Sequence, residues 1–174
     1  FHYAIHIGVG YQASIWADVA TSGHLMLSFK TPAAGTQIHL LPDSNSEIST
    51  VFKIHEAAVV NQDSTLRPVY NRNRYTYSAS NTLCEDNSTG GSPGDYTPGN
   101  ISLAGTHATA GTVINNSGQG HYTGAGRTNS GNEDASHEWV LKPATVYVFK
   151  YTNNSGSSTN EMTMVLNWFE VPDG

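Results

Sequence analysis

Hydrophobic and polar residues alternate along several segments of the chain with the two-residue period of a β-strand. In residues 24–30, for example, Leu25, Leu27 and Phe29 share one face of such a strand. Pro32 then ends the strand, because proline has no backbone N–H to donate to a neighbouring strand. No segment shows a convincing stripe with helical spacing. The pattern therefore predicts a protein built from strands.

Two strong strands are predicted near the end of the chain. Residues 145–151 place three aromatic side chains on one face, and residues 162–170 place four large apolar side chains on one face. These side chains are Tyr147, Phe149 and Tyr151 in the first strand, and Met162, Met164, Leu166 and Trp168 in the second. Residues 153–156 have the composition of a turn, so the two strands are predicted to pair as an antiparallel hairpin. Trp168 and Phe149 are both expected to face the interior.

Three further segments show shorter strand patterns. Residues 38–41 form an apolar run that Pro42 is predicted to close, and residues 137–141 form another run before Pro143. Residues 47–60 alternate again along their length. One side of that alternation carries Ile48, Phe52 and Ile54, and the other carries Lys53 and His55. Its last four residues also suit a helical turn, but we predict strand.

The chain opens with His2 and His6, four residues apart. On a helix this spacing stacks both imidazoles on one face, as in many zinc sites. Ile5 and Gly8 disfavour a helix, so we predict a strand over residues 3–9. In a strand the two side chains lie ~13 Å apart, too far for two ligands that each sit ~2 Å from one ion. We therefore predict no metal at this pair. The sequence leaves open a metal held by histidines of separate strands, namely His24, His39 and His55.

The chain contains no pattern that predicts catalysis. Residues 90–94 match the G-x-S-x-G nucleophile elbow, but Pro93 follows the serine and has no N–H for an oxyanion. Glu133, Asp134 and Glu138 lie in and beside a polar loop with no apolar pocket nearby in sequence, so we interpret them as solvated. No nucleotide-binding motif is present. We expect no enzymatic activity, no catalytic residues and no cofactor.

The composition supports an all-β domain and argues against several partners. Of the 174 residues, 37% are hydrophobic and 13% are charged, and residues 81–134 are dense in Gly, Asn, Ser and Thr. Short strands with long polar loops predict one antiparallel β-sandwich of jelly-roll type over residues 1–174. The net charge is −6, with Lys and Arg spread along the chain, so nucleic acid is not an expected partner. No apolar run approaches the ~20 residues that span a bilayer, so no membrane partner is expected.

The ends and the cysteine content bear on where the protein folds. Cys84 is the single cysteine, which excludes an internal disulfide and favours folding in a reducing cytoplasm. The chain begins at Phe1 rather than at a methionine and shows no signal peptide. We expect an N-terminal segment to have been removed or left out.

Two segments have the composition of a protein interface. On the predicted first strand, alternate apolar residues form a stripe that either the domain's own sheet or a neighbouring subunit must cover. Between residues 67 and 77, arginines interleave with tyrosines, and both types are favoured in interfaces. The alternative for this second segment is an ordinary edge strand whose aromatics half-pack on the core. We predict an N-terminal arm over residues 1–7. The candidate contact residues are Phe1, Tyr3, Ile5, Ile7, Arg72, Arg74, Tyr75 and Tyr77.

Four stretches occur in an order that is similar to a known family. They are HYAIHIG at residues 2–8, HLMLSFKTP at 24–32, EWVLKP at 138–143 leading to Tyr147, and LNWFE at 166–170. The chain thereby resembles the small head decoration, or cement, proteins of tailed bacteriophages. Relatives show a His-x-x-x-His-x-Gly-like start, a strand ending in Lys-Thr-Pro, a Glu-Trp-x-Leu-Lys segment and a final aromatic-Glu. The likeness covers both ends of the chain around a variable middle.

The resemblance implies a structural virion protein without a catalytic site. Its expected fold is a β-sandwich on the outer face of an icosahedral head, with trimers sitting between capsomers. The expected partners are the major capsid protein and further copies of this chain, assembled in the bacterial cytoplasm. The main alternative is a receptor- or glycan-binding module of a tail fibre or lectin, because sugar sites use exposed aromatics with Asn and Asp on loops. A small hydrolase is a third and more distant alternative.

Overall fold

The computed structural model of the chain describes residues 2–33, 35–58, 65–66, 68–75, 79–80, 83–86, 111–119, 138–156 and 158–172. Apart from one short helix, the regular elements in this part of the chain are strands. In chain order they are α1 (His2–His6), β1 (Gly10–Val19), β2 (His24–Lys30), β3 (Thr36–Ser46), β4 (Thr50–Glu56), β5 (Thr65–Leu66), β6 (Tyr70–Asn71), β7 (Leu83–Asp86), β8 (Thr112–Gln119), β9 (Trp139–Leu141), β10 (Val146–Asn153) and β11 (Asn160–Pro172). No helix in these residues is long and apolar enough to cross a membrane.

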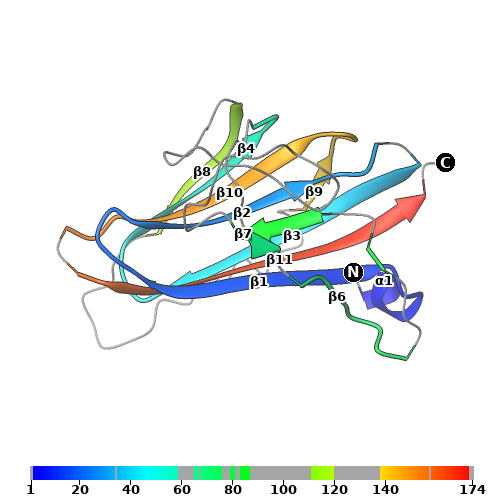
Figure 1. Cartoon of the computed structure of the whole chain (residues 1–174), viewed down its shortest axis with the longest axis horizontal. Helices are drawn as coiled ribbons and strands as arrows, with labels where there is room; N and C mark the ends of the chain where they lie inside the picture. The colour runs from blue at the N-terminus through cyan, green and yellow to red at the C-terminus, as the bar shows by residue number, and fades with distance from the viewer. Residues whose placement is uncertain are drawn as a thin grey trace.

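The strands form two antiparallel sheets that pack against each other (Figure 1). Sheet A has the strand order β6-β1-β11-β3-β9, and sheet B has the order β5-β7-β2-β10-β4-β8. The long strands that follow one another in sequence alternate between the sheets, because β1 and β3 lie in sheet A while β2 and β4 lie in sheet B. The predicted all-β sandwich is confirmed.

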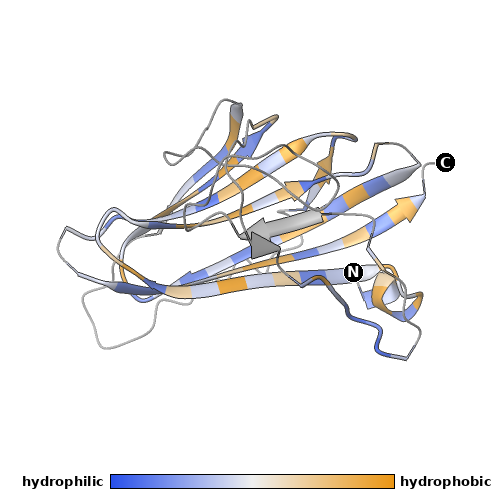
Figure 2. Ribbon diagram, in the orientation of Figure 1, coloured by the Kyte–Doolittle hydropathy of each residue, from blue (hydrophilic) through white to orange (hydrophobic). Residues whose placement is uncertain are grey.

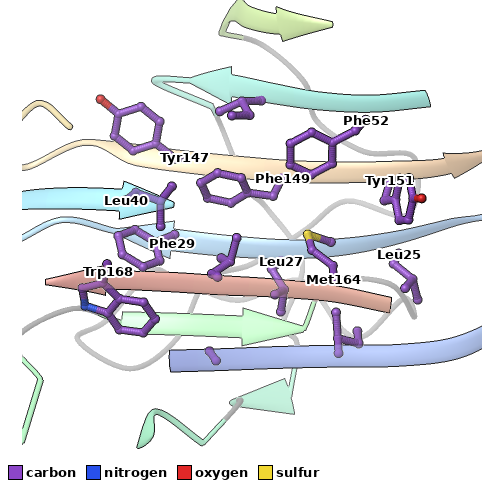
Figure 3. Close-up of a cluster of buried hydrophobic side chains, with 14 of the residues drawn as sticks. Leu25, Leu27, Phe29, Leu40, Phe52, Tyr147, Phe149, Tyr151, Met164 and Trp168 are labelled. Carbon is purple, nitrogen blue, oxygen red and sulfur yellow. The ribbon is translucent and has the colours of Figure 1, made fainter. Parts of the chain in front are cut away.

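The core lies between the sheets and takes one face of each long strand. Orange and blue segments alternate along these strands in Figure 2, as the two-residue period requires. The largest fully buried side chains include Trp168, Tyr147, Tyr151, Phe29 and Phe149, several of which appear in Figure 3. Full burial of one large apolar side chain contributes ~1.5–3 kcal/mol. This cluster is therefore the main source of stability in the fold.

Most of the strands predicted from alternation are present with the predicted faces. Residues 24–30 are β2, with Leu25, Leu27 and Phe29 all buried in the core. The three aromatics of residues 145–151 and the four apolar residues of 162–170 are buried from β10 and β11. Trp168 and Phe149 both face the interior, as predicted. The short strand near residues 137–141 is β9.

The predicted hairpin between the last two strands is wrong. β10 pairs with β2 and β4 in sheet B, whereas β11 pairs with β1 and β3 in sheet A. The residues between them do turn, because Ser155 N donates to Asn153 Oδ1 at 2.9 Å. Asn153 Nδ2, however, donates to Val19 O at 2.9 Å, at the end of a strand of sheet A. The connection between β10 and β11 therefore crosses from one sheet to the other instead of joining two neighbouring strands of the same sheet.

Two strand boundaries also differ from the predictions. β3 continues through Pro42 to Ser46, and Pro42 lies opposite Leu166 of β11. On the other side of β3, the pairing with β9 covers only Ile38 to Leu40, so the missing N–H of proline costs no ladder bond there. In the segment predicted over residues 47–60, β4 ends at Glu56, because Ala57 has a positive φ of 54° that leaves the strand.

The strand predicted over residues 3–9 is wrong, because this segment begins with helix α1. Its turn is closed by backbone bonds such as Ile7 N to Tyr3 O at 3.1 Å, and Gly8 ends it with a φ of 80°. Tertiary packing outweighs the low helix propensity, since Ala4 is buried and Ile5 lies against Gly10. A Cβ at Gly10 would come within 3.0 Å of Ile5 Cγ1. The glycine thus allows the helix to fold back onto β1.

Candidate interaction surface

Helix α1 lies beside β6 and residues 72–75. The structure thus brings together the two segments, residues 1–7 and 67–77, that were predicted separately from the sequence as interface segments. Asn73 Nδ2 donates to His6 O at 2.9 Å, and Asn71 Nδ2 donates to Gly8 O at 2.7 Å. The backbone N–H of Arg72 donates to Gly10 O at 2.8 Å. Both segments lie at the end of the sandwich where β11 ends (Figure 1).

The two asparagines also shape the 72–75 segment itself. The N–H of Asn73 donates to Asn71 Oδ1 at 2.8 Å, and the N–H of Tyr75 donates to Asn73 Oδ1 at 3.0 Å. These are side-chain-to-backbone turns of the kind that asparagine favours. Asn71 is 1% exposed, so each of its bonds is shielded from water. A pair of amides therefore holds both segments in one conformation.

The side chains presented by these segments are large and exposed. Tyr75 is 97% exposed, Tyr3 is 75% exposed, and Ile7 and Tyr70 are each more than half exposed. Arg72 and Arg74 are exposed between the tyrosines. We refer to this group as the α1–β6 surface, made of Tyr3, Ile7, Tyr70, Arg72, Arg74 and Tyr75. Aromatic and arginine side chains of this kind are enriched at the centres of protein interfaces.

One of the predicted contact residues does not belong to this surface, and two others lie outside the described residues. Ile5 is half-buried, because the helix turns it toward Gly10 instead of leaving it on an exposed stripe. Phe1 and Tyr77 lie outside the described residues. The predicted apolar stripe on an extended arm is thus replaced by a short helix that exposes Tyr3 and Ile7.

The helix also reverses the geometry expected for the two N-terminal histidines. The Nε2 atoms of His2 and His6 lie 3.0 Å apart, and the ring centroids are 4.5 Å apart. The prediction that this pair holds no metal rested on the separation in a strand, and that separation is wrong. The histidines His24, His39 and His55 do not gather, and no group of three or more metal-ligating side chains occurs among the residues that the structure describes.

The outward face of sheet A carries a further exposed aromatic residue, Trp16. It is 70% exposed in the middle of β1, and it points away from the core because its neighbour Ile15 is on the buried face of the strand. Gln12 lies on the same face of β1, four residues before Trp16, and its Nε2 donates to Asn167 Oδ1 at 3.1 Å. The sequence reasoning missed Trp16, because no strand was assigned to residues 10–19 although their alternation is clear.

His39 and Glu138 form another polar contact on the outward face of sheet A. His39 Nδ1 contacts Glu138 Oε1, and the His39 ring stacks on Phe169 with centroids 4.6 Å apart. Glu138 was interpreted from the sequence as a solvated acid, and it is exposed while its contact with His39 also joins the start of β9 to β3. Glu133, Asp134 and residues 90–94 lie outside the described residues.

The outward face of sheet B holds an open pocket bounded by basic residues. It is lined by Val51, Lys53, His55, Lys150, Thr152 and Asn154. Lys53 and Lys150 lie directly opposite each other on β4 and β10. His55 is only 6% exposed, and neither ring nitrogen has a hydrogen-bond partner among the described residues. Burial lowers the pKa of His55 from its ordinary value, and the charges of Lys150 and Lys53 lower it further.

At one end of the core, Glu56 connects two elements through a polar cluster. Lys142 Nζ donates to Glu56 Oε1 at 2.6 Å, and Tyr147 Oη donates to Glu56 Oε2 at 3.1 Å. The bond from Lys142 is the main cause of a lowered pKa for the Glu56 carboxyl group. Burial, together with Glu56, raises the pKa of Tyr147 to about 12. The cluster holds the carboxylate ionised and the phenol protonated, which suits a structural link between β4 and β10.

Comparison with protein-family models, with curated proteins and with solved structures found no match in any of the three. Of the surfaces described above, the α1–β6 surface has the largest set of exposed aromatic and arginine side chains, on a backbone held by side-chain hydrogen bonds.

Proposed function

We propose that this protein is a structural, non-enzymatic component of a tailed-bacteriophage virion that binds the outer surface of the head as a decoration, or cement, protein. Its partners in this proposal are the major capsid protein and other copies of the same chain, arranged as a homotrimer. The sequence resemblance supplies the family. The α1–β6 surface supplies the means of binding.

The observation that carries this proposal is the exposure of Tyr3, Ile7 and Tyr75 beside Arg72 and Arg74. Large apolar side chains grouped on the surface of a soluble domain mark a contact with another molecule. The side-chain hydrogen bonds of Asn71 and Asn73 to Gly8 O and His6 O already hold the backbone of this surface in place. Binding through this surface therefore orders few additional groups, which lowers its entropic cost. A protein that clamps capsid subunits benefits from such a preformed contact.

We also infer that the sandwich is a jelly roll. β1 pairs with β11 and β2 with β10, while β3 and β4 pair with the other sides of β11 and β10. With β9 beside β3 and β8 beside β4, each sheet contains a run of four strands, β1-β11-β3-β9 and β2-β10-β4-β8, to which the short strands β6, β7 and β5 are added at one edge. This nested order is typical of two interlocked Greek keys, a fold that recurs in viral capsid and lectin domains. The fold suits the proposal without selecting between these uses.

The proposal is tested with empty heads assembled from the major capsid protein of the same genome. Purified protein should co-sediment with these heads at hundreds of copies per particle, and a Tyr75→Ala/Arg74→Ala variant should lose most of this binding. Trp16→Ala serves as the matched control, since Trp16 is similarly exposed on another face. Equal loss in the control, or absence of binding by the unmodified protein, would contradict the proposal.

One observation favours the alternative of a glycan-binding module. Trp16 stands 70% exposed on the outward face of sheet A, and the side-chain amides of Gln12 and Asn167, bonded to each other, lie on the same face ~13 Å further along β1. An exposed indole ring is a platform on which a sugar ring could stack. Glycan-array binding that Trp16→Ala abolishes, and that Tyr75→Ala leaves intact, would select this function over decoration.

A further inference from the structure

Helix α1 brings two imidazole rings together on an exposed face of the molecule. His2 and His6 are one helical turn apart, and both side chains are exposed. Their rings meet edge to face, with an interplanar angle of 77°. Their Nε2 atoms are 3.0 Å apart.

This separation matches the distance between two nitrogens bound to one metal ion. Two imidazole nitrogens that each lie about 2.0–2.1 Å from an ion, at an angle of about 90–110°, are about 2.9–3.4 Å apart. The 3.0 Å measured here falls inside that range. The pair thus needs shifts of no more than a few tenths of an ångström to chelate. Without an ion, the same contact requires one nitrogen to carry a proton that the other accepts.

The backbone that carries the two rings is held from outside the helix. Asn73 Nδ2 bonds to His6 O and Asn71 Nδ2 bonds to Gly8 O, while Ala4 is buried beneath the helix. A single turn of helix is unstable by itself. These tertiary contacts hold it in place before any ligand binds, so binding does not have to order the helix. The histidines are therefore a preformed pair.

We propose that His2 and His6 form a bidentate site for one divalent transition-metal ion of the borderline class, namely Zn²⁺, Ni²⁺ or Cu²⁺. Neutral imidazole nitrogen is a preferred ligand for these ions, whereas Mg²⁺ and Ca²⁺ prefer oxygen. No third protein ligand completes the set among the described residues. Water molecules fill the remaining positions, so the ion exchanges readily and binds less tightly than in a four-ligand structural site. This inference stands independently of the proposed function.

The order of affinity among ions follows from the same chemistry. For a given set of nitrogen ligands, affinity rises from Ni²⁺ to Cu²⁺ and is lower again for Zn²⁺. We therefore expect the site to bind Cu²⁺ most tightly, and Mg²⁺ to compete for it negligibly even in large excess.

The test is calorimetric titration of the full chain with NiCl2 and with ZnCl2. We expect one ion per chain in the strongest binding step and at least a tenfold loss of that affinity in both His2→Ala and His6→Ala. The matched control is His6→Ala/Ile7→His, which keeps the number of histidines but moves the second ring off the face of His2. It should bind as weakly as His6→Ala. Circular dichroism without metal should be the same for all variants, since both histidines are exposed.

Two results would overturn the proposal. One is the absence of a binding step in the unmodified protein at millimolar Zn²⁺ and Ni²⁺. The other is unchanged affinity in the His6→Ala/Ile7→His control, because a site that tolerates this shift cannot depend on chelation across one helical turn.

Discussion

The indole ring of Trp168 meets the ring of Phe29 edge to face, with the ring centroids 4.9 Å apart and the planes at 88°. Trp168 belongs to sheet A and Phe29 to sheet B, so this contact joins the two layers within the core (Figure 3). The indole N–H is also paired, since Nε1 donates to Glu170 Oε1 at 3.4 Å.

Trp168→Ala should therefore destabilise the fold by ~3–5 kcal/mol, the usual cost of truncating a buried aromatic residue of this size. Trp16→Ala is the matched control in the same sheet, and it should change the free energy of unfolding by about 0.5 kcal/mol or less because Trp16 is exposed. Urea denaturation followed by circular dichroism measures both. Similar costs for the two variants would mean that the strand faces are assigned incorrectly.

Stability should fall as the pH is lowered below about 6.5, in part because of His55. Its pKa is lowered in the folded protein, chiefly by burial, so the unfolded chain binds a proton on this residue more readily than the folded one. The contribution of His55 is therefore fully present above the ordinary histidine pKa and is lost as the pH falls from there through the lowered pKa of the folded state. His55→Gln should flatten the dependence of the melting temperature on pH between 7.5 and 5, and an unchanged dependence would contradict this assignment.

Asn71→Ala should destabilise the α1–β6 surface and the domain together. The substitution leaves Gly8 O and the N–H of Asn73 without their side-chain partner at a buried position, at a cost of ~1–3 kcal/mol. Hydrogen exchange of residues 4–10 should accelerate. Asn154→Ala, at an exposed asparagine, is the control and should have little effect. Unchanged exchange in Asn71→Ala would show that the amide does not hold the helix.

Deletion of residues 1–7 should leave the sandwich folded and abolish binding to heads. The core strand β1 begins at Gly10, and Ala4 is the one residue of α1 that is buried. Removal of the helix takes Tyr3 and Ile7 away from the α1–β6 surface. Circular dichroism and co-sedimentation with heads measure the two outcomes. Loss of folding would make the segment part of the core, and unchanged binding would remove it from the interface.

Alternation predicted the strand faces well, because burial on one side of a sheet is a local property of the sequence. Leu25, Leu27 and Phe29 illustrate this, since the faces of β2 follow directly from their spacing. Pairing partners are not local. The turn-forming residues after Asn153 suggested a hairpin, but nothing near them in sequence indicates that the chain crosses to the other sheet there.

The residue types of the candidate surface were recognised from the sequence, but the helical conformation of its N-terminal part was not. Arg72, Arg74 and Tyr75 were identified from their residue types as contact residues; the structure shows that they are exposed, and their contact with a partner stays a prediction. The helix at the N-terminus was missed because its formation depends on contacts with Asn71 and Asn73, more than sixty residues away. Propensity alone favoured a strand, and tertiary contacts reversed it.

The position of β11 constrains the order in which the molecule can be completed. This last strand lies in the middle of sheet A, where residues 160–169 pair with residues 10–19 on one side and β3 lies on the other. During synthesis β1 and β3 therefore emerge long before the strand that joins them, and such distant pairing makes folding slow. A chain that stops short of β11 exposes two long unpaired edges that invite aggregation. Only a copy translated through β11 can bury them, so the fold itself discriminates against chains that terminate before this strand.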